Sequence, residues 1–192
     1  MLRLFLFTVF FGLVGISAFA QSPTEAKKDG DGCIMYGQDH VFAIKLPPGW
    51  VVNPEIGKQL GLHAVMYPEG SSWQDSMVTM YSSFVHKGKD KKSLEAIIEE
   101  DIAGYRKGSP HLKVENVASL PVRNRKQRII VKYFSGDQGG NFDAVAYIEE
   151  SKVVVMLVLN SRTEKDFQST LPAFRELVGS YRFISENVTF QQ

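Results

Sequence analysis

The chain has 192 residues, with 22 lysine and arginine side chains against 21 aspartate and glutamate side chains. This balance excludes a general attraction to nucleic acid or to an anionic membrane, and the single cysteine, Cys33, excludes an internal disulfide. The length suits one domain that buries its own core.

Residues 1–20 have the three parts of a secretory signal. Arg3 is their only charge, an apolar run follows it, and Ala18 and Ala20 place small residues at an A-x-A cleavage site. The alternative is an uncleaved anchor helix, since about 20 apolar residues can span a bilayer. Cleavage after Ala20 removes one basic residue and no acid, which leaves 21 of each. We expect a periplasmic or secreted protein of a bacterial envelope, with no transmembrane anchor after cleavage.

The region after the signal predicts an irregular start and then a series of short strands. Residues 21–32 are polar and predict a flexible lead-in, residues 33–185 form a single domain, and residues 186–192 form a frayed tail. Apolar residues bounded by turn residues predict strands at 33–36, 41–46, 62–67 and 77–84. Cys33 is expected to be a buried hydrophobic residue or else a thiol that pairs with a second chain.

The clearest helix begins after Ser93, which is a suitable N-cap. Its apolar residues recur at helical spacing and form one stripe, made of Leu94, Ile97, Ile98, Ile102 and Tyr105. Pro110 prevents the helix from continuing. The stripe predicts that this helix lies on a sheet.

Three further strands are predicted at 127–134, 142–149 and 153–159. The first two alternate between faces, and a glycine-rich hairpin loop joins them. The third is apolar throughout, which is typical of a strand that is buried on both faces. We therefore expect 153–159 to lie centrally in the sheet.

The last helix is expected to begin near Thr163, because Asp166 three residues later resembles a capping box. Pro172 predicts a kink, or two short helices that meet there. A short strand follows at 181–184. Short connections between consecutive strands predict an α+β fold, with a largely antiparallel twisted sheet flanked by helices on both faces.

The order of these elements resembles the PsbP-like fold family. Residues 42–50 (Phe-Ala-Ile-Lys-Leu-Pro-Pro-Gly-Trp) resemble its opening strand and Pro-Gly-Trp turn, and the helix at Ser93 matches in position. Phe167, Leu171-Pro172 and the 180–183 exit resemble its final helix and strand. The resemblance covers residues 41–184 and implies an α/β/α sandwich, shared with bacterial exported PsbP- and DcrB-like proteins. Its motifs are packing motifs, so it transfers no functional residues.

No catalytic, cofactor or metal motif is present in the sequence. The four histidines (His40, His63, His86 and His111) lack metal-ligand spacing, and we expect each to be structural. Asp137 and Asn141 beside a glycine pair suggest turn chemistry rather than a calcium loop. We expect no cofactor and no metal. Enzymatic activity is left open, and the sequence favours its absence.

The charge distribution suggests one binding surface. Basic residues are concentrated in a candidate patch for a partner, formed by Arg123, Arg125, Lys126, Arg128 and Lys132. The alternative is an ordinary solvated hairpin turn. A patch on an exported protein would meet an anionic envelope polymer, a lipid headgroup or an acidic protein surface, and not nucleic acid.

The sequence therefore favours a non-enzymatic exported protein that binds a macromolecular partner or supports an assembly. One alternative is a small-ligand or metal-binding module, with a groove at Trp73 beside the 69–76 loop. Trp73 could instead cover the core. A further alternative is a hydrolase whose site is assembled from distant residues.

Overall fold

The structure, a computed structural model, describes residues 25–29, 32–117 and 127–187. The predicted signal at residues 1–20 lies outside this part, and so do Arg123, Arg125 and Lys126. Those predictions therefore stay predictions.

The described strands form two antiparallel sheets. The small sheet has the order β1-β2-β3-β11, with β1 at Glu25–Asp29, β2 at Gly32–Gly37, β3 at His40–Lys45 and β11 at Arg182–Ser185. The large sheet has the order β4-β5-β6-β10-β9-β8-β7. Its strands are β4 (Trp50–Asn53), β5 (Ala64–Pro68), β6 (Val78–His86), β7 (Lys113–Val117), β8 (Ile129–Ser135), β9 (Phe142–Glu149) and β10 (Val153–Ser161).

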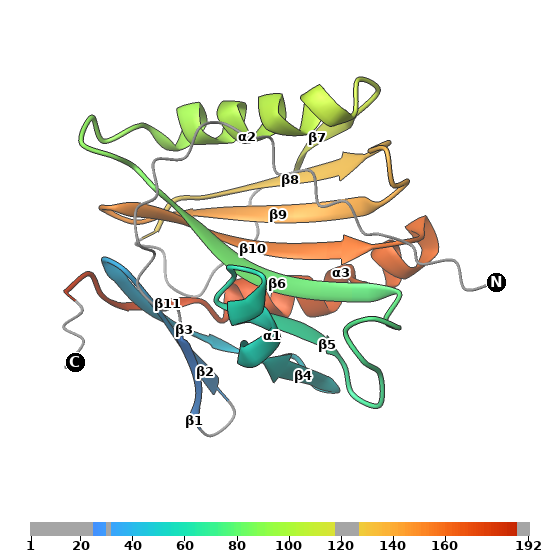
Figure 1. Cartoon of the computed structure of the whole chain (residues 1–192), viewed down its shortest axis with the longest axis horizontal. Helices are drawn as coiled ribbons and strands as arrows, with labels where there is room; N and C mark the ends of the chain where they lie inside the picture. Colours follow the sequence, from blue (N-terminus) through green and yellow to red (C-terminus); the bar gives the residue numbers. More distant parts are fainter. Residues whose placement is uncertain (1–24, 30–31, 118–126, 188–192) are drawn as a thin grey trace.

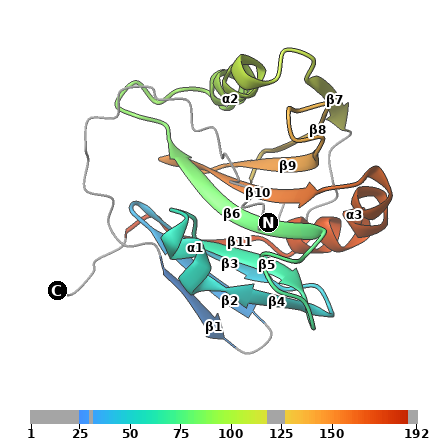
Figure 2. The same cartoon turned by 45° about the vertical axis from the view of Figure 1, so that its right-hand side comes forward.

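Three helices accompany the sheets in the described part of the chain. They are α1 (Pro54–Gln59), α2 (Leu94–Gly108) and α3 (Glu164–Gly179). Figures 1 and 2 show α2 on one side of the large sheet, and α3 with the small sheet on the other side. The expected α+β fold, with helices on both faces of an antiparallel sheet, is confirmed.

Alternation along the strands divides the core into two clusters. In β10, Val155 and Leu157 face α3, whereas Val154 and Val158 face α2, and all four are buried. β10 lies between β6 and β9. The apolar run at 153–159 is therefore a central strand, as predicted.

Both predicted helix starts are confirmed. The Ser93 side chain accepts a hydrogen bond from the Ala96 amide at 3.2 Å, and the Thr163 side chain accepts one from the Asp166 amide at 3.1 Å. Pro172 lies inside a single helix, α3, so the alternative of two short helices is wrong.

The structure differs from the sequence-based expectation at several short elements. Residues 25–29, expected to be a flexible lead-in, form strand β1, because an edge strand needs only backbone pairing and no apolar stripe. Cys33, by contrast, is buried in the core that the small sheet helps to form, which agrees with the expectation of a buried hydrophobic residue. The sequence also predicts one sheet where two are present, and it misses β4, α1 and β7.

Candidate functional site

The face of the large sheet beneath α2 carries a group of tyrosines and polar residues. Tyr81 on β6 pairs with Val158 on β10, and Met156 on β10 pairs with Tyr147 on β9, so all four share this face. The apolar stripe of α2 covers only part of it. Val158 and Tyr147 are buried, whereas Tyr81 and Met156 stay partly exposed.

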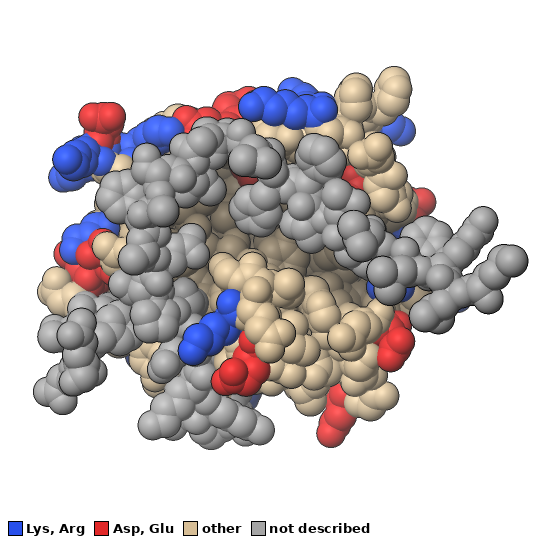
Figure 3. Space-filling model, viewed as in Figure 1, with Lys and Arg blue, Asp and Glu red and all other residues tan. Residues whose placement is uncertain are grey.

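Figure 3 shows a hollow below the ridge that α2 forms, and most of the described surface visible inside it is uncharged. We define the hollow by the residues that share this face and the facing side of α2: Tyr81, Asp101, Tyr105, Asp143, Tyr147, Met156 and Asn160. Its members come from α2, β6, β9 and β10. Residues far apart in sequence therefore converge on one face.

Hydrogen bonds fix the polar residues of the hollow. The Tyr147 hydroxyl donates to Asp101 Oδ2 at 2.5 Å, which ties β9 to α2. On the neighbouring strand pair, Asn160 Nδ2 donates to Asp143 Oδ1 at 2.6 Å. Asn160 and Asp143 are also cross-strand partners in the sheet. The side chains are thus held by the secondary structure that carries them.

Burial makes both carboxyl groups of the hollow weaker acids than usual. Desolvation raises the pKa of Asp143 to about 7, against the opposing hydrogen bond from Asn160. Desolvation also raises the pKa of Asp101. The pKa of Tyr81 is raised by burial and by the nearby carboxyl groups, so its phenol stays neutral. The hollow can therefore donate and accept hydrogen bonds, and Asp143 can change its charge near neutral pH.

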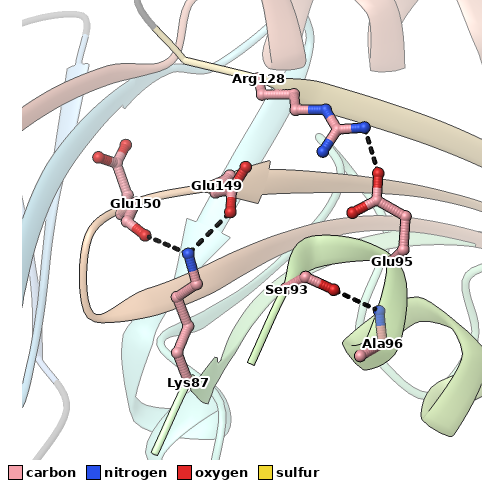
Figure 4. Close-up of polar contacts among 7 residues, drawn as sticks. All are labelled: Lys87, Ser93, Glu95, Ala96, Arg128, Glu149 and Glu150. Atoms are coloured by element: carbon pink, nitrogen blue, oxygen red, sulfur yellow. Dashed lines mark hydrogen bonds and ion pairs between the residues drawn. The ribbon is translucent and has the colours of Figure 1, made fainter. Parts of the chain in front are cut away.

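Two of the five predicted patch residues can be placed, and both are held by intramolecular contacts. Arg128 forms an ion pair with Glu95 at the start of α2, and Lys132 donates a hydrogen bond to Asn116 (Figure 4 shows the Arg128 pair). The hydrogen bond from Arg128 lowers the pKa of Glu95. Arg128 therefore connects the large sheet to α2, although more than half of its side chain is exposed.

Two lysines of the loop between β6 and α2 also form intramolecular contacts. The Lys87 ammonium lies 2.7 Å from a Glu149 carboxylate oxygen and 3.4 Å from the Glu150 carbonyl oxygen (Figure 4). Lys92 forms an ion pair with Glu100 on α2. These contacts hold the loop between β6 and α2 against the molecule.

Trp73 is partly exposed in the loop between β5 and β6. Asp137 accepts hydrogen bonds from the amide and the side chain of Asn141, which is the expected turn chemistry. Among the described residues, no group of three or more histidines, cysteines or acids could hold a metal ion. In the same part of the chain, no helix is long and apolar enough to cross a membrane.

The residues of the hollow were missed by sequence reasoning. One signal was available, because Asp143 shares the α2-facing set of β9 with the buried residues Val145 and Tyr147, whereas the other acid of that set, Glu149, lies at the end of the strand. His40 and His63 were expected to be separate structural histidines, and the structure brings their rings into contact. His86 lies near Phe84 and is exposed.

No protein-family model matches the chain, and no curated protein matches it. The structure is similar to that of cyanobacterial PsbP (CyanoP) from Synechocystis sp. PCC 6803, with a TM-score of 0.50 and 12% identity, over 91% of this chain and 99% of that chain. It is also similar to PA94 from Pseudomonas aeruginosa, a protein of unknown function, with a TM-score of 0.46 and 11% identity, over 83% and 96% of the two chains.

At 12% identity the likeness to CyanoP shows the fold alone. The chain therefore has a PsbP-like fold, which confirms the resemblance drawn from its packing motifs. No residue role passes from that protein to this one.

Proposed function

We propose that this chain is an exported, non-enzymatic binding protein whose macromolecular partner docks on the hollow beneath α2. The observation that carries this proposal is the partial exposure of Tyr81, Tyr105 and Met156 on a face whose polar residues are already fixed. Aromatic residues and methionine are enriched at the centres of protein interfaces. A fixed polar frame around them favours recognition without a large ordering cost.

The exported state is the second part of the proposal. It rests on the signal-like pattern of residues 1–20, with Arg3 before the apolar run and alanines at the cleavage positions. N-terminal sequencing of the mature protein from the cell envelope tests it. A start at Gln21 supports export with cleavage of the signal, and a mature chain that retains Met1 contradicts that cleavage.

Site-specific crosslinking in native cells tests the docking face. A photoreactive phenylalanine analogue at Ser83 or at Tyr105 would lie on the hollow side, and the same analogue at Arg175 would lie on the exposed side of α3. We expect a discrete crosslinked product from the first two positions and none from Arg175. Equal products from all three positions, or a product from Arg175 alone, would contradict docking on this face.

A second candidate function is the binding of a small ligand in the same hollow. It is favoured by Asp101 and Asp143, two carboxyl groups whose pKa values are raised by burial, with no described basic residue in contact. A primary amine would supply the missing positive charge.

Melting temperatures measured with 2-phenylethylammonium and with neutral 2-phenylethanol test the small-ligand candidate. Stabilisation by the amine alone, absent in Asp143→Asn, would favour a small ligand over a macromolecular partner. No shift with either compound would count against it.

A further inference from the structure

Two buried histidines join the small sheet to the large sheet. His40 on β3 and His63, just before β5, have 0% and 1% exposed surface, and their Nε2 atoms are 2.6 Å apart. His40 Nδ1 lies 2.8 Å from the Gln38 carbonyl oxygen. His63 Nδ1 lies 3.2 Å from the hydroxyl of Ser82 on β6, which is itself fully buried.

These contacts fix the tautomers of the neutral rings. The Gln38 carbonyl can only accept, so His40 carries its hydrogen on Nδ1 and presents a bare Nε2. The short contact then requires His63 to donate from Nε2, which leaves its Nδ1 to accept from the Ser82 hydroxyl. Each ring nitrogen of the two histidines, and the Ser82 hydroxyl, therefore has a hydrogen-bond partner when both rings are neutral. We call His40, His63 and Ser82 the histidine latch.

Aromatic rings enclose the latch and exclude water from it. Phe42 and Phe84 both lie within 6.0 Å, between ring centroids, of His40 and His63. The fit is tight, because a Cβ on Gly37 would lie 2.2 Å from His40 Cε1. Gly37 therefore leaves just enough room for the ring.

The charged groups around the latch give it little compensation for an added proton. His86 on β6 lowers the pKa of His40, and Asp39 raises it slightly, but Asp39 is already paired with Lys152 at 3.2 Å. On the β11 side, Phe42 stacks on Tyr181, whose hydroxyl donates to Glu150. Burial raises the pKa of Glu150 to about 7.

We propose that the histidine latch is an acid-sensitive connection, and that its protonation releases the small sheet from the large sheet. One added proton can keep the hydrogen bonds, because His63 Nδ1 can then donate to Ser82. It nevertheless places a positive charge among aromatic rings at a site with no solvent. A second proton leaves two N–H groups facing each other at 2.6 Å.

The lowered pKa values of the two histidines give the direction in which pH changes the strength of the connection between the sheets. Burial lowers the pKa of His63 to about 3 and also lowers the pKa of His40, whereas a solvated histidine has a pKa of about 6.5. The open state therefore binds protons more readily than the closed state. The connection is at full strength above about pH 6.5 and weakens as the pH falls below it.

Cys33 reports on the opening directly, because it lies on β2, is 1% exposed and is the only cysteine of the chain. Its labelling by 4,4′-dithiodipyridine would be measured at pH 7 and pH 5 and normalised at each pH to the denatured protein. His63 alone predicts an increase of about 25-fold in the normalised rate at pH 5, from its pKa in the two states. An increase below threefold would overturn the proposal.

Amide hydrogen exchange distinguishes local release from general unfolding. Protection factors, corrected for intrinsic rates, should fall at pH 5 for β3 and stay within threefold for β9. An equal fall in both strands would contradict release of the small sheet.

Two variants identify the groups responsible. His40→Phe combined with His63→Leu should label at pH 5 no faster than at pH 7, because no histidine of the latch then remains to gain a proton on opening. His63→Gln keeps His40, whose pKa burial also lowers, so this variant should reduce the acid response without removing it. His86→Gln, on the exposed end of β6, should keep the acid response. Loss of the response in His86→Gln would overturn the proposal, and the wild type and this variant suffice if the latch variants do not fold.

Discussion

Asp143 places an ionisable carboxyl group in the large sheet with 4% of its surface exposed. Its pKa is about 7 in the folded protein, against about 3.9 for a solvated carboxyl group. The folded state therefore holds this proton more tightly than the unfolded state does. Between about pH 4 and pH 7, ionisation of Asp143 should lower the free energy of unfolding as the pH rises.

The substitution Asp143→Asn removes this dependence and can still accept the hydrogen bond from Asn160. The difference in the free energy of unfolding, variant minus wild type, should increase by roughly 1.4 kcal/mol for each unit that the pH rises between about pH 4 and 7. Above pH 7 the difference should stay constant. Urea unfolding at a series of pH values measures it. Glu176→Gln, an exposed carboxyl group on α3, is the control and should show no such trend; a flat difference for Asp143→Asn would be inconsistent with a buried acid.

Two glycines, one in a crowded position and one in an open position, allow a matched pair of alanine substitutions. Gly37 faces the His40 ring at a distance that no side chain can share, whereas a Cβ on Gly104 of α2 would meet nothing within 4 Å. Gly37→Ala should destabilise the protein by about 1–3 kcal/mol through overpacking. Gly104→Ala should stabilise it by about 0.5–1 kcal/mol, because alanine favours the helix. Thermal unfolding of the two variants checks both signs, and stabilisation by Gly37→Ala would refute the packing around His40.

At the scale of elements, the basic patch is still a proposal, because Arg123, Arg125 and Lys126 lie outside the described residues. We expect their replacement by glutamate to weaken binding to phosphatidylglycerol vesicles or to polyglutamate, and to remove the salt dependence of that binding. Co-sedimentation at two salt concentrations measures it.

A control with the same change in net charge separates a patch from a general effect. Lys58, Lys165 and Arg175 are exposed and scattered over α1 and α3, so their replacement by glutamate should weaken binding much less. Equal losses in the two triple variants would rule the patch out.

The elements that could be predicted from sequence are those with a long, consistent period. The apolar stripe of α2 and the continuous apolar run of β10 specify both type and burial, so both were predicted with nearly correct bounds. By contrast, β4 and α1 are four and six residues long, and turn residues surround them. The division into two sheets was missed because local patterns do not specify which strands pair.

The contacts that define the hollow and the latch depend on that pairing. His40 and His63 are 23 residues apart, and they meet only because β3 and β5 belong to different sheets that pack together. In the same way, Asp101 reaches Tyr147 from a helix that comes 46 residues earlier. No spacing rule within the sequence connects either pair.

At the scale of the whole molecule, the buried groups have opposite effects on the response to acid. The pKa of His63 is lowered to about 3, so acidification below about pH 6.5 destabilises the folded state through this residue. The pKa values of Asp143 and Glu150 are raised to about 7, so acidification below pH 7 stabilises the folded state through them. Global stability of the wild type should therefore change little, or rise, between pH 7 and pH 5.

Removing two of the three acids whose pKa values are raised by burial should expose the effect of the histidines. In the double variant Asp143→Asn with Glu150→Gln, we expect the free energy of unfolding to fall by about 2 kcal/mol from pH 7 to pH 5, through His63 alone. Glu150 contributes less than Asp143 to the difference from wild type, because it is only partly buried. Adding His63→Gln should make this fall smaller, and the part that remains should come from His40. Denaturant unfolding of the wild type, the double variant and the triple variant at both pH values measures these differences. If the double variant is as insensitive to acid as the wild type, protonation of the buried histidines does not destabilise the folded state.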